Sequence, residues 1–342
     1  ITYVVQETSM KRPLFSKLFA ALFASATLAM SMVAPTQAQS AENYPERAVK
    51  IINSSATGSS PDAISRLIAH KLSEKWGQSV LIENIAGLGG IIGTERAVKQ
   101  TADGYTLLLS TIGAMSVGVS VMDNLPYDPV KDFVPITMSM YMPNLFVVHP
   151  SVPVKTVEEL VAYIKANPGK LRYGHPGAGT TGHLSGEMFK QQMGVEMLGI
   201  PYKSSSHMAT DLLAGHFEVL FHNSSVMLPH VRSGAATALG VTSLERVAAM
   251  PDVPTLSESG MPDFSINAWW GFYAPAGTPP EIIKKVNQDI NAIIAEPEVQ
   301  AWITERMGTP GGGTPEELAA FQASETKKWA EVIKNADIPT EQ

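Results

Sequence analysis

The chain has 342 residues, of which 44% are hydrophobic and 17% charged, and its formal net charge is −7. This composition indicates a globular protein and excludes a disordered or fibrous chain, and the acidic balance argues against nucleic acid as a partner. The sequence has no cysteine, which excludes disulfides, thiol catalysis and cysteine-based metal sites.

The first predicted element is a targeting segment. From Met10, a basic stretch that includes Lys11 and Arg12 precedes an apolar run at residues 18–32, and small and polar residues follow at 38–41. This is the layout of a secretory signal, and the apolar run is shorter than the ~20 residues that a membrane-spanning helix needs. We therefore expect residues 1–40 to be an N-terminal extension with a signal peptide, and the remainder to be exported from the cytoplasm.

Predicted strands and helices alternate along the rest of the chain. Capping boxes at Thr156–Glu159 and Thr314–Glu317 each predict the start of a helix, and Pro61 is placed for a first helical turn. Two α/β sets with mainly parallel sheets predict two lobes with a crevice between them, because helices then cover both faces of each sheet. Strands are expected at residues 49–52, 80–83, 105–109, 133–138, 145–148, 171–173, 197–200, 219–221, 238–241 and 269–273.

Loops rich in serine, threonine and glycine follow several of these strands. They occupy residues 53–60, 110–113, 174–181 and 223–225. In an open α/β sheet, ligands bind at this rim, where the first N–H groups of each helix are unpaired and carry partial positive charge. The pattern predicts a site for a carboxylate or phosphate, although each polar residue taken singly is also an ordinary helix cap.

No catalytic signature is complete. Residues 177–182 match G-x-G-x-x-G, but the next strand lacks the acidic residue that a dinucleotide site needs at its end. The eight histidines include no H-x-x-x-H pair, which leaves only a zinc site assembled from distant ones, and we expect no metal or cofactor. We predict that the protein is not an enzyme. An exported hydrolase that uses Ser110, His175 or His183 is the alternative.

Trp269 and Trp270 are adjacent in a predicted strand. Successive strand residues point to opposite faces of a sheet, so at most one of the two can face a cleft.

A set of short motifs is distributed along the chain. They are Tyr44-Pro45-Glu46-Arg47, Asp103-Gly104-Tyr105-Thr106-Leu107-Leu108, Leu125-Pro126-Tyr127-Asp128-Pro129, Asn167-Pro168-Gly169-Lys170-Leu171, Gly179-Thr180-Thr181, Pro201-Tyr202-Lys203, Asp252-Val253-Pro254-Thr255 and Ala274-Pro275-Ala276-Gly277-Thr278-Pro279. With these motifs, the sequence resembles the extracytoplasmic solute receptors of tripartite tricarboxylate transporters, the Bug family, over nearly all of the chain after the signal.

The resemblance implies a two-lobe, type II periplasmic binding protein fold without catalytic activity, each lobe a mainly parallel sheet flanked by helices. Residues 41–143 and 265–342 would form lobe 1, and residues 144–264 would form lobe 2. A small organic acid would be captured between the lobes and delivered to the membrane permease subunits of a tripartite tricarboxylate transporter. We expect a monomer. A receptor of the same fold that signals to a sensor kinase is the alternative.

In the resembling family, the ligand carboxylate lies between the first-strand loop and the G-x-G-T loop. Here Ile112 and Met115 make the third-strand loop more apolar than is usual, and His222 stands where an aspartate usually precedes the asparagine. These departures favour a di- or tricarboxylate, with an aromatic dicarboxylate such as a phthalate as one candidate. The residues expected to bind the ligand are Ser54, Ala56, Thr57, Ser59, Ser110, Gly177, Ala178, Gly179, Thr180, His222 and Asn223.

Overall fold

The computed structural model describes residues 2–4, 43–202 and 205–335. The expected signal peptide lies outside these ranges. The fold described below is that of the compact unit formed by residues 40–342. Among the helices of the described ranges, none is long and apolar enough to cross a membrane.

The strands of the described residues join into one mixed sheet. They are β1 (Val49–Asn53), β2 (Val80–Asn84), β3 (Thr106–Thr111), β4 (Phe133–Val148), β5 (Arg172–His175), β6 (Leu198–Pro201), β7 (Val219–Asn223), β8 (Thr237–Val241), β9 (Asn267–Pro275) and β10 (Thr309–Gly312). The order along the sheet is β2-β1-β3-β9-β4-β7-β5-β6, and β8 and β10 both pair with β4.

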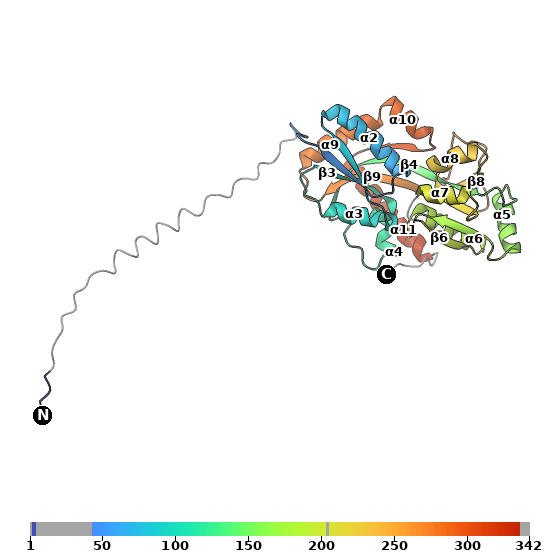
Figure 1. Cartoon of the computed structure of the whole chain (residues 1–342), viewed down its shortest axis with the longest axis horizontal. Coiled ribbons are helices and arrows are strands. Elements are labelled where there is room, and N and C mark those ends of the chain that lie inside the picture. The colour runs from blue at the N-terminus through green and yellow to red at the C-terminus, as the bar shows by residue number, and fades with distance from the viewer. Residues whose placement is uncertain (1, 5–42, 203–204, 336–342) are drawn as a thin grey trace. The chain divides into compact units, whose positions relative to one another are not determined.

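Two groups of parallel strands flank an antiparallel centre. The first strand group is β1 with β2 and β3, and the second is β5 with β6 and β7; within each group the pairs with β1 or β5 are parallel. Strands β4 and β9 run antiparallel to each other and join the two groups. Figure 1 shows the groups at opposite ends, with β4 and β9 between them. This arrangement confirms the predicted α/β class.

Strand β4 corrects the sequence-based prediction. Two strands were expected, at residues 133–138 and 145–148, but β4 is a single strand of 16 residues. Its first part pairs with β9 as far as Pro143, and from Asn144 onward it pairs with β7 and β8. Proline and asparagine are strand breakers in isolation, and here the pairing partners on both sides hold the chain extended. The lobe boundaries at residues 143/144 and 264/265 stay a prediction.

Strand β10 was not predicted. Its sequence, Thr309-Pro310-Gly311-Gly312, is typical of a turn, and only its antiparallel pairing with β4 makes it a strand.

Helices cover both faces of the sheet. They are α2 (Ser60–Trp76), α3 (Ile91–Val98), α4 (Gly118–Val121), α5 (Val157–Ala166), α6 (Thr181–Met193), α7 (Ser205–Leu213), α8 (Ser224–Arg232), α9 (Pro280–Ile294), α10 (Pro297–Thr304) and α11 (Pro315–Asn335), with short turns η1 (Leu88–Gly90) and η2 (Gly113–Val117). Both predicted capping boxes begin a helix: Thr156 accepts from the Glu159 N–H before α5, and Thr314 accepts from the Glu317 N–H before α11.

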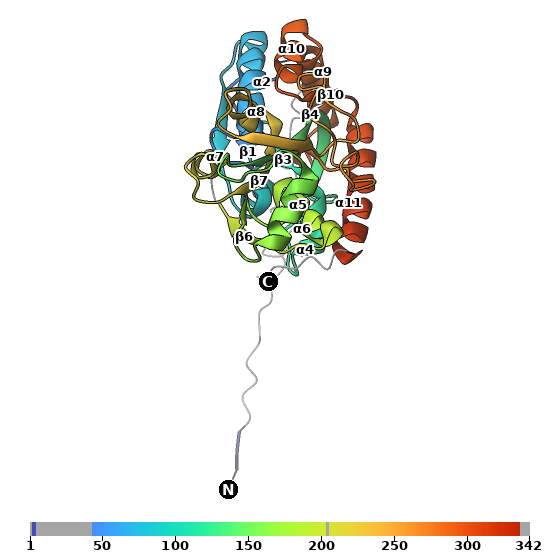
Figure 2. The same ribbon diagram turned by 90° about the vertical axis from the view of Figure 1, so that its right-hand side faces the viewer.

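The core has separate clusters on the two faces of the sheet. Ile64 and Ile290 of α2 and α9 pack with alternate residues of β1 and β3, such as Ile51. On the opposite face of the sheet, Phe189 of α6 and Trp329 of α11 belong to one cluster. Figure 2 shows α11 running along one side of the molecule, and its last residues reach α6, where Gln191 Nε2 donates to the Asn335 carbonyl at 2.8 Å.

Candidate functional site

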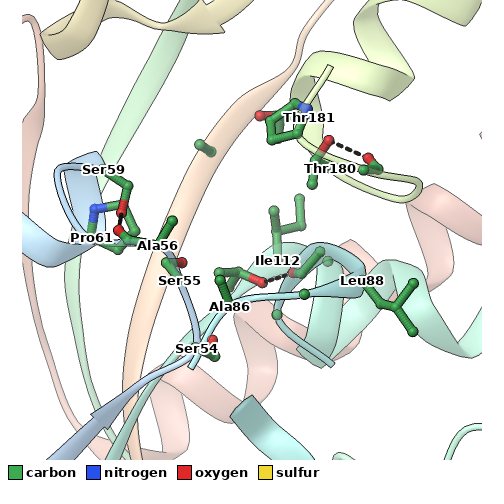
Figure 3. Close-up of a pocket in the computed structure, with 18 of the residues that line it drawn as sticks. Ser54, Ser55, Ala56, Ser59, Pro61, Ala86, Leu88, Ile112, Thr180 and Thr181 are labelled. Carbon is green, nitrogen blue, oxygen red and sulfur yellow. Dashed lines mark hydrogen bonds between the residues drawn. The ribbon is translucent and has the colours of Figure 1, made fainter. Parts of the chain in front are cut away.

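A cavity of about 490 Å³ lies at the carboxyl ends of both strand groups (Figure 3). Its size is within the roughly 300–1,000 Å³ that is usual for small-molecule sites. The segments after β1, β2, β3, β5 and β6 line it, together with ends of β7 and β9. The lining residues are 54–56, 59, 61, 86–90, 92, 111–113, 176–178, 180, 181, 201, 202, 223, 268 and 270.

Seven of the eleven predicted residues lie in this lining. They are Ser54, Ala56, Ser59, Gly177, Ala178, Thr180 and Asn223. The structure thus brings the first-strand loop and the G-x-G-T loop to one cavity, although they are more than 100 residues apart in the sequence. That these residues contact a ligand stays a prediction.

Four predicted residues lie outside the lining. Ser110 is fully buried and its hydroxyl pairs with Thr94 Oγ1 at 2.8 Å. His222 is 2% exposed, and its Nδ1 accepts the Asn223 N–H at 2.8 Å. Thr57 is exposed to solvent.

Gly179, the fourth, points away from the cavity. A Cβ on this residue would lie 3.2 Å from Val117 Cγ1 and 3.3 Å from Val121 Cγ2. It therefore supports the loop from behind by letting it pack closely on η2 and α4.

The loop at residues 86–90, after β2, was missed as a candidate. It is a glycine-rich segment that follows a strand and ends at the N-cap of α3, which was a usable signal. A Cβ on Gly90 would lie 2.7 Å from Thr111 Oγ1 and 3.0 Å from Ser54 Oγ. The loops after β1 and β2 can therefore meet only because residue 90 has no side chain.

The two tryptophans divide as strand geometry requires. Trp270 lines the cavity. Trp269 has no exposed surface; its Nε1 donates to Glu325 Oε2 at 3.2 Å and its ring packs on Phe321 with centroids 5.4 Å apart. Only Trp270 is therefore available to a ligand.

Helix N-termini, and no charged side chain of the described residues, line the cavity. None of the lining residues, all within the described ranges, carries a charge at neutral pH; burial and a hydrogen bond to Asp211 raise the pKa of Tyr202 to about 12. Helix N-termini, which carry about half a positive charge each, converge on the same space. Their N-cap residues in the lining are Ser59 of α2, Gly90 of α3, Thr180 of α6 and Asn223 of α8.

The hydroxyl groups of the lining mainly hold the loops in shape. Their protons go to loop carbonyls, as the dashed lines in Figure 3 mark: Ser59 to Ala56 at 2.6 Å, Thr180 to Gly177 at 2.7 Å and Thr111 to Gly89 at 2.6 Å. Backbone N–H groups at the helix starts are then the donors that a bound anion would meet. The side chain of Asn223 adds to these donors, because its Nδ2 is buried and has no hydrogen-bond partner within the described part of the chain.

Asp62 holds the loop after β1, residues 54–59, in place; this is called the first loop from here on. Its carboxylate accepts the Gly58 N–H at 2.9 Å and Asn84 Nδ2 at 2.8 Å, and pairs with Arg66 at 2.9 Å. Asn84 also donates to the Ser55 carbonyl at 3.3 Å. Burial by itself would raise the pKa of Asp62, but the hydrogen bonds from Gly58, Arg66 and Asn84 prevail and lower it. The carboxylate therefore stays charged and holds the loop rigid.

Two histidines lie behind the G-x-G-T loop at residues 176–180, which is called the second loop from here on. The rings of His175 and His183 are 4.7 Å apart, and His175 Nδ1 accepts the Gly177 N–H at 3.3 Å. Burial lowers the pKa of both imidazoles, that of His183 to about 4. Within the described ranges, no three histidine, cysteine, aspartate or glutamate side chains are grouped so as to hold a metal ion.

Comparison with known proteins gives one consistent result. Residues 64–338 match the sequence model described as the tripartite tricarboxylate transporter family receptor. The chain is 36% identical over 296 residues to protein BugT of Bordetella pertussis, which covers 86% of this chain and 91% of that protein.

Solved structures agree with this match. Rpa4515 of R. palustris, determined with adipate, superposes with a TM-score of 0.85 at 34% identity and covers 87% of this chain and 100% of that one. MatC of Rhodopseudomonas palustris, determined with bound malate, has a TM-score of 0.80 at 28% identity, over 85% of this chain and 100% of that one.

Proposed function

The chain belongs to the tripartite tricarboxylate transporter receptor family, and from this premise we propose that it is a periplasmic receptor that binds a small organic carboxylate. In this proposal the acid is passed unchanged to the membrane permease subunits of such a transporter. The family consists of substrate-binding receptors and not of enzymes. The hydrolase alternative lacks support, because the Ser110 hydroxyl is fully buried against Thr94 and lies outside the cavity.

One observation carries the proposal: four helix N-termini meet at a cavity whose lining, within the described part of the chain, has no charged side chain. An anion suits this site, since it would accept from N–H groups that lack partners and would interact favourably with the helix dipoles. A cation would face the same partial positive charges without a carboxylate among the described lining residues to compensate them.

The ligand that we propose is a di- or tricarboxylate, and an aromatic dicarboxylate such as a phthalate is the first candidate. Adipate and malate, in the two structural relatives, are both dicarboxylates. The lining adds apolar surface from Trp270, Ile112 and Ile92, against which a ring or an alkyl chain can pack. Two carboxylates would be held at opposite ends, by the first loop around Ser54–Ser59 and by the second loop at Gly177–Thr180, with Asn223 Nδ2 as a further donor.

A ligand screen tests the proposal. The purified protein is melted with phthalate, adipate, malate and citrate, with matched neutral amides and with amines. A carboxylate that binds only the folded state stabilises it by mass action and so raises Tm. At a hundredfold excess over Kd, the free energy of unfolding increases by about 2.7 kcal/mol. Calorimetry then measures Kd, and chromatography of the recovered ligand verifies that it is unaltered. Binding of amides or amines alone, or chemical conversion of the acid, would contradict the proposal.

A further inference from the structure

The second loop is built around the two histidines. His175 is the last residue of β5 and His183 is in the first turn of α6, and the loop between them supplies Pro176, Gly177, Ala178 and Thr180 to the cavity. Neither ring lines the cavity, and His175 is only 8% exposed. The imidazoles therefore lie directly behind the segment that faces the ligand.

Both backbone polar groups of Gly177 are hydrogen-bonded to side chains. Its N–H donates to His175 Nδ1 at 3.3 Å, and its carbonyl accepts from Thr180 Oγ1 at 2.7 Å. The φ angle of Gly177 is 113°, a conformation that glycine adopts readily and residues with a Cβ rarely do, so glycine permits this shape and the two hydrogen bonds select it. A ring nitrogen accepts a hydrogen bond only while it carries no proton. His175 must thus be neutral, with its proton on Nε2, for the loop to have this shape.

Among the described residues, the surroundings of the pair offer no free counter-ion. Glu187 of α6 accepts from the Tyr173 hydroxyl and from Lys190 Nζ at 2.9 Å, so its charge is already compensated. These three are the titratable groups that face the pair from β5 and α6. From the neighbouring strand β6, Gly199 packs against Tyr173 and Pro201 pairs with His175, and both are uncharged. After β6, the Tyr202 N–H donates to the His175 carbonyl at 2.9 Å, and the Tyr202 phenol is neutral because its pKa is raised to about 12.

The second ring does not share the proton. His183 Nδ1 is buried and has no hydrogen-bond partner within the described part of the chain, and a charge on His175 disfavours a charge on His183 at 4.7 Å. A proton on His175 Nδ1 would moreover place two donors, this N–H and that of Gly177, against each other.

We propose that His175 is a positioning residue of the ligand site: neutral, it holds the Gly177 peptide in its binding shape, and protonation in acidic solution releases the loop and weakens carboxylate binding. This inference rests on the proposed carboxylate-binding function. A protonated ring also attracts an anion, and the proposal is that the loss of the acceptor outweighs this attraction, so a Kd that falls on acidification would overturn it.

Calorimetry with phthalate at pH 7.5 and 5.0 tests the inference. For the wild type we expect Kd to be higher at pH 5.0 than at pH 7.5, by no more than the roughly tenfold that one lost hydrogen bond of ordinary strength implies. His175→Asn carries an amide oxygen near the position of Nδ1 that cannot take up a proton in this range, so it should keep the affinity at pH 7.5 and lose most of the pH dependence. His175→Ala should bind weakly at both values, and circular dichroism verifies its folding.

The controls separate this inference from the proposed function. His70→Asn, on the exposed face of α2, should leave affinity and its pH dependence unchanged. Protonation of phthalate itself affects all variants equally, so only the difference between the wild type and His175→Asn counts. Equal pH dependence in the two would overturn the inference while leaving the function intact.

A measurement without ligand completes the test. Imidazole ¹⁵N chemical shifts of the ligand-free protein at pH 7.5 should identify the Nε2–H form of His175. The Nδ1–H form would overturn the inference whatever binds. If no carboxylate binds at either pH, the proposed function fails and the part of the inference that concerns affinity fails with it.

Discussion

Ser60 and Ser225 are joined by a hydrogen bond of 2.6 Å between their side-chain oxygens. Ser60 is in the first turn of α2, after the first strand group, and Ser225 is in the first turn of α8, after the second. A second contact between the groups involves Gly89, where a Cβ would lie 3.0 Å from the Ala178 carbonyl oxygen. The cavity is thus bordered by direct contacts between segments of both strand groups.

Loss of the serine pair should weaken ligand binding. We expect Ser60→Ala and Ser225→Ala each to raise Kd for the bound carboxylate about threefold, because one hydrogen bond contributes about 0.5–1.5 kcal/mol. The double variant should cost little more than either single one, since both remove the same bond. Calorimetry measures the cycle, with Ser324→Ala on the exposed face of α11 as control. Additive effects in the double variant would contradict a direct coupling.

Substitutions in the second loop should reduce affinity in a definite order. Thr180→Ala removes both the cap of α6 and the bond to the Gly177 carbonyl, which should cost about 1 kcal/mol and raise Kd about fivefold. Gly179→Val should be more severe, because φ is 70° there and the new Cβ would meet Val117 at 3.2 Å. Titration calorimetry gives both affinities, and circular dichroism verifies the fold. Unchanged Kd in both variants would remove this loop from the site.

Asp62 should contribute stability that depends on pH. The pKa of this carboxyl is lowered in the folded state, below its ordinary value of about 3.9. Its contribution is therefore fully present above pH ~4 and is lost as pH falls through the folded-state pKa. Asp62→Asn should lower the free energy of unfolding by about 1–3 kcal/mol at pH 7, because Gly58 and Arg66 lose a charged acceptor.

Urea unfolding at pH 7, 5 and 3 measures this effect. The difference between the wild type and Asp62→Asn should narrow at pH 3, where the wild-type carboxyl also begins to take up a proton. Asp252→Asn, at an exposed position, is the matched control and should change little at any pH. A constant difference from pH 7 to pH 3 would show that the charge of Asp62 has no role.

The two neighbouring tryptophans should respond differently to the same substitution. Trp270→Phe reduces the apolar surface of the cavity, so it should raise Kd for phthalate several-fold and Kd for malate less. Trp269→Phe leaves the cavity wall intact but deprives the buried Glu325 carboxylate of an indole donor, and should lower the free energy of unfolding by about 1–3 kcal/mol. Calorimetry and urea unfolding of both variants distinguish the two roles. A loss of affinity in Trp269→Phe together with a loss of stability in Trp270→Phe would refute both roles.

Sequence motifs alone identified the family correctly, and local signals gave much of the secondary structure. The capping boxes at Thr156 and Thr314 each begin a helix as predicted, because a helix cap is a hydrogen bond between residues three positions apart. Polar loops after strands likewise predicted which segments line the cavity, since the chain order of strand, loop and helix already fixes which loops reach the same edge of a sheet.

Tertiary structure decided what depends on pairing between distant segments. Thr111 faces the cavity and Ser110 does not, and Trp270 does while Trp269 does not, because the register between β3 and β9 sets Thr111 opposite Trp270. The same holds for β4, which pairing with strands far away in the sequence keeps extended through Pro143. A strand's alternation is visible in its own residues, but which of its faces meets the cavity is fixed only by the strands and loops that pack against it.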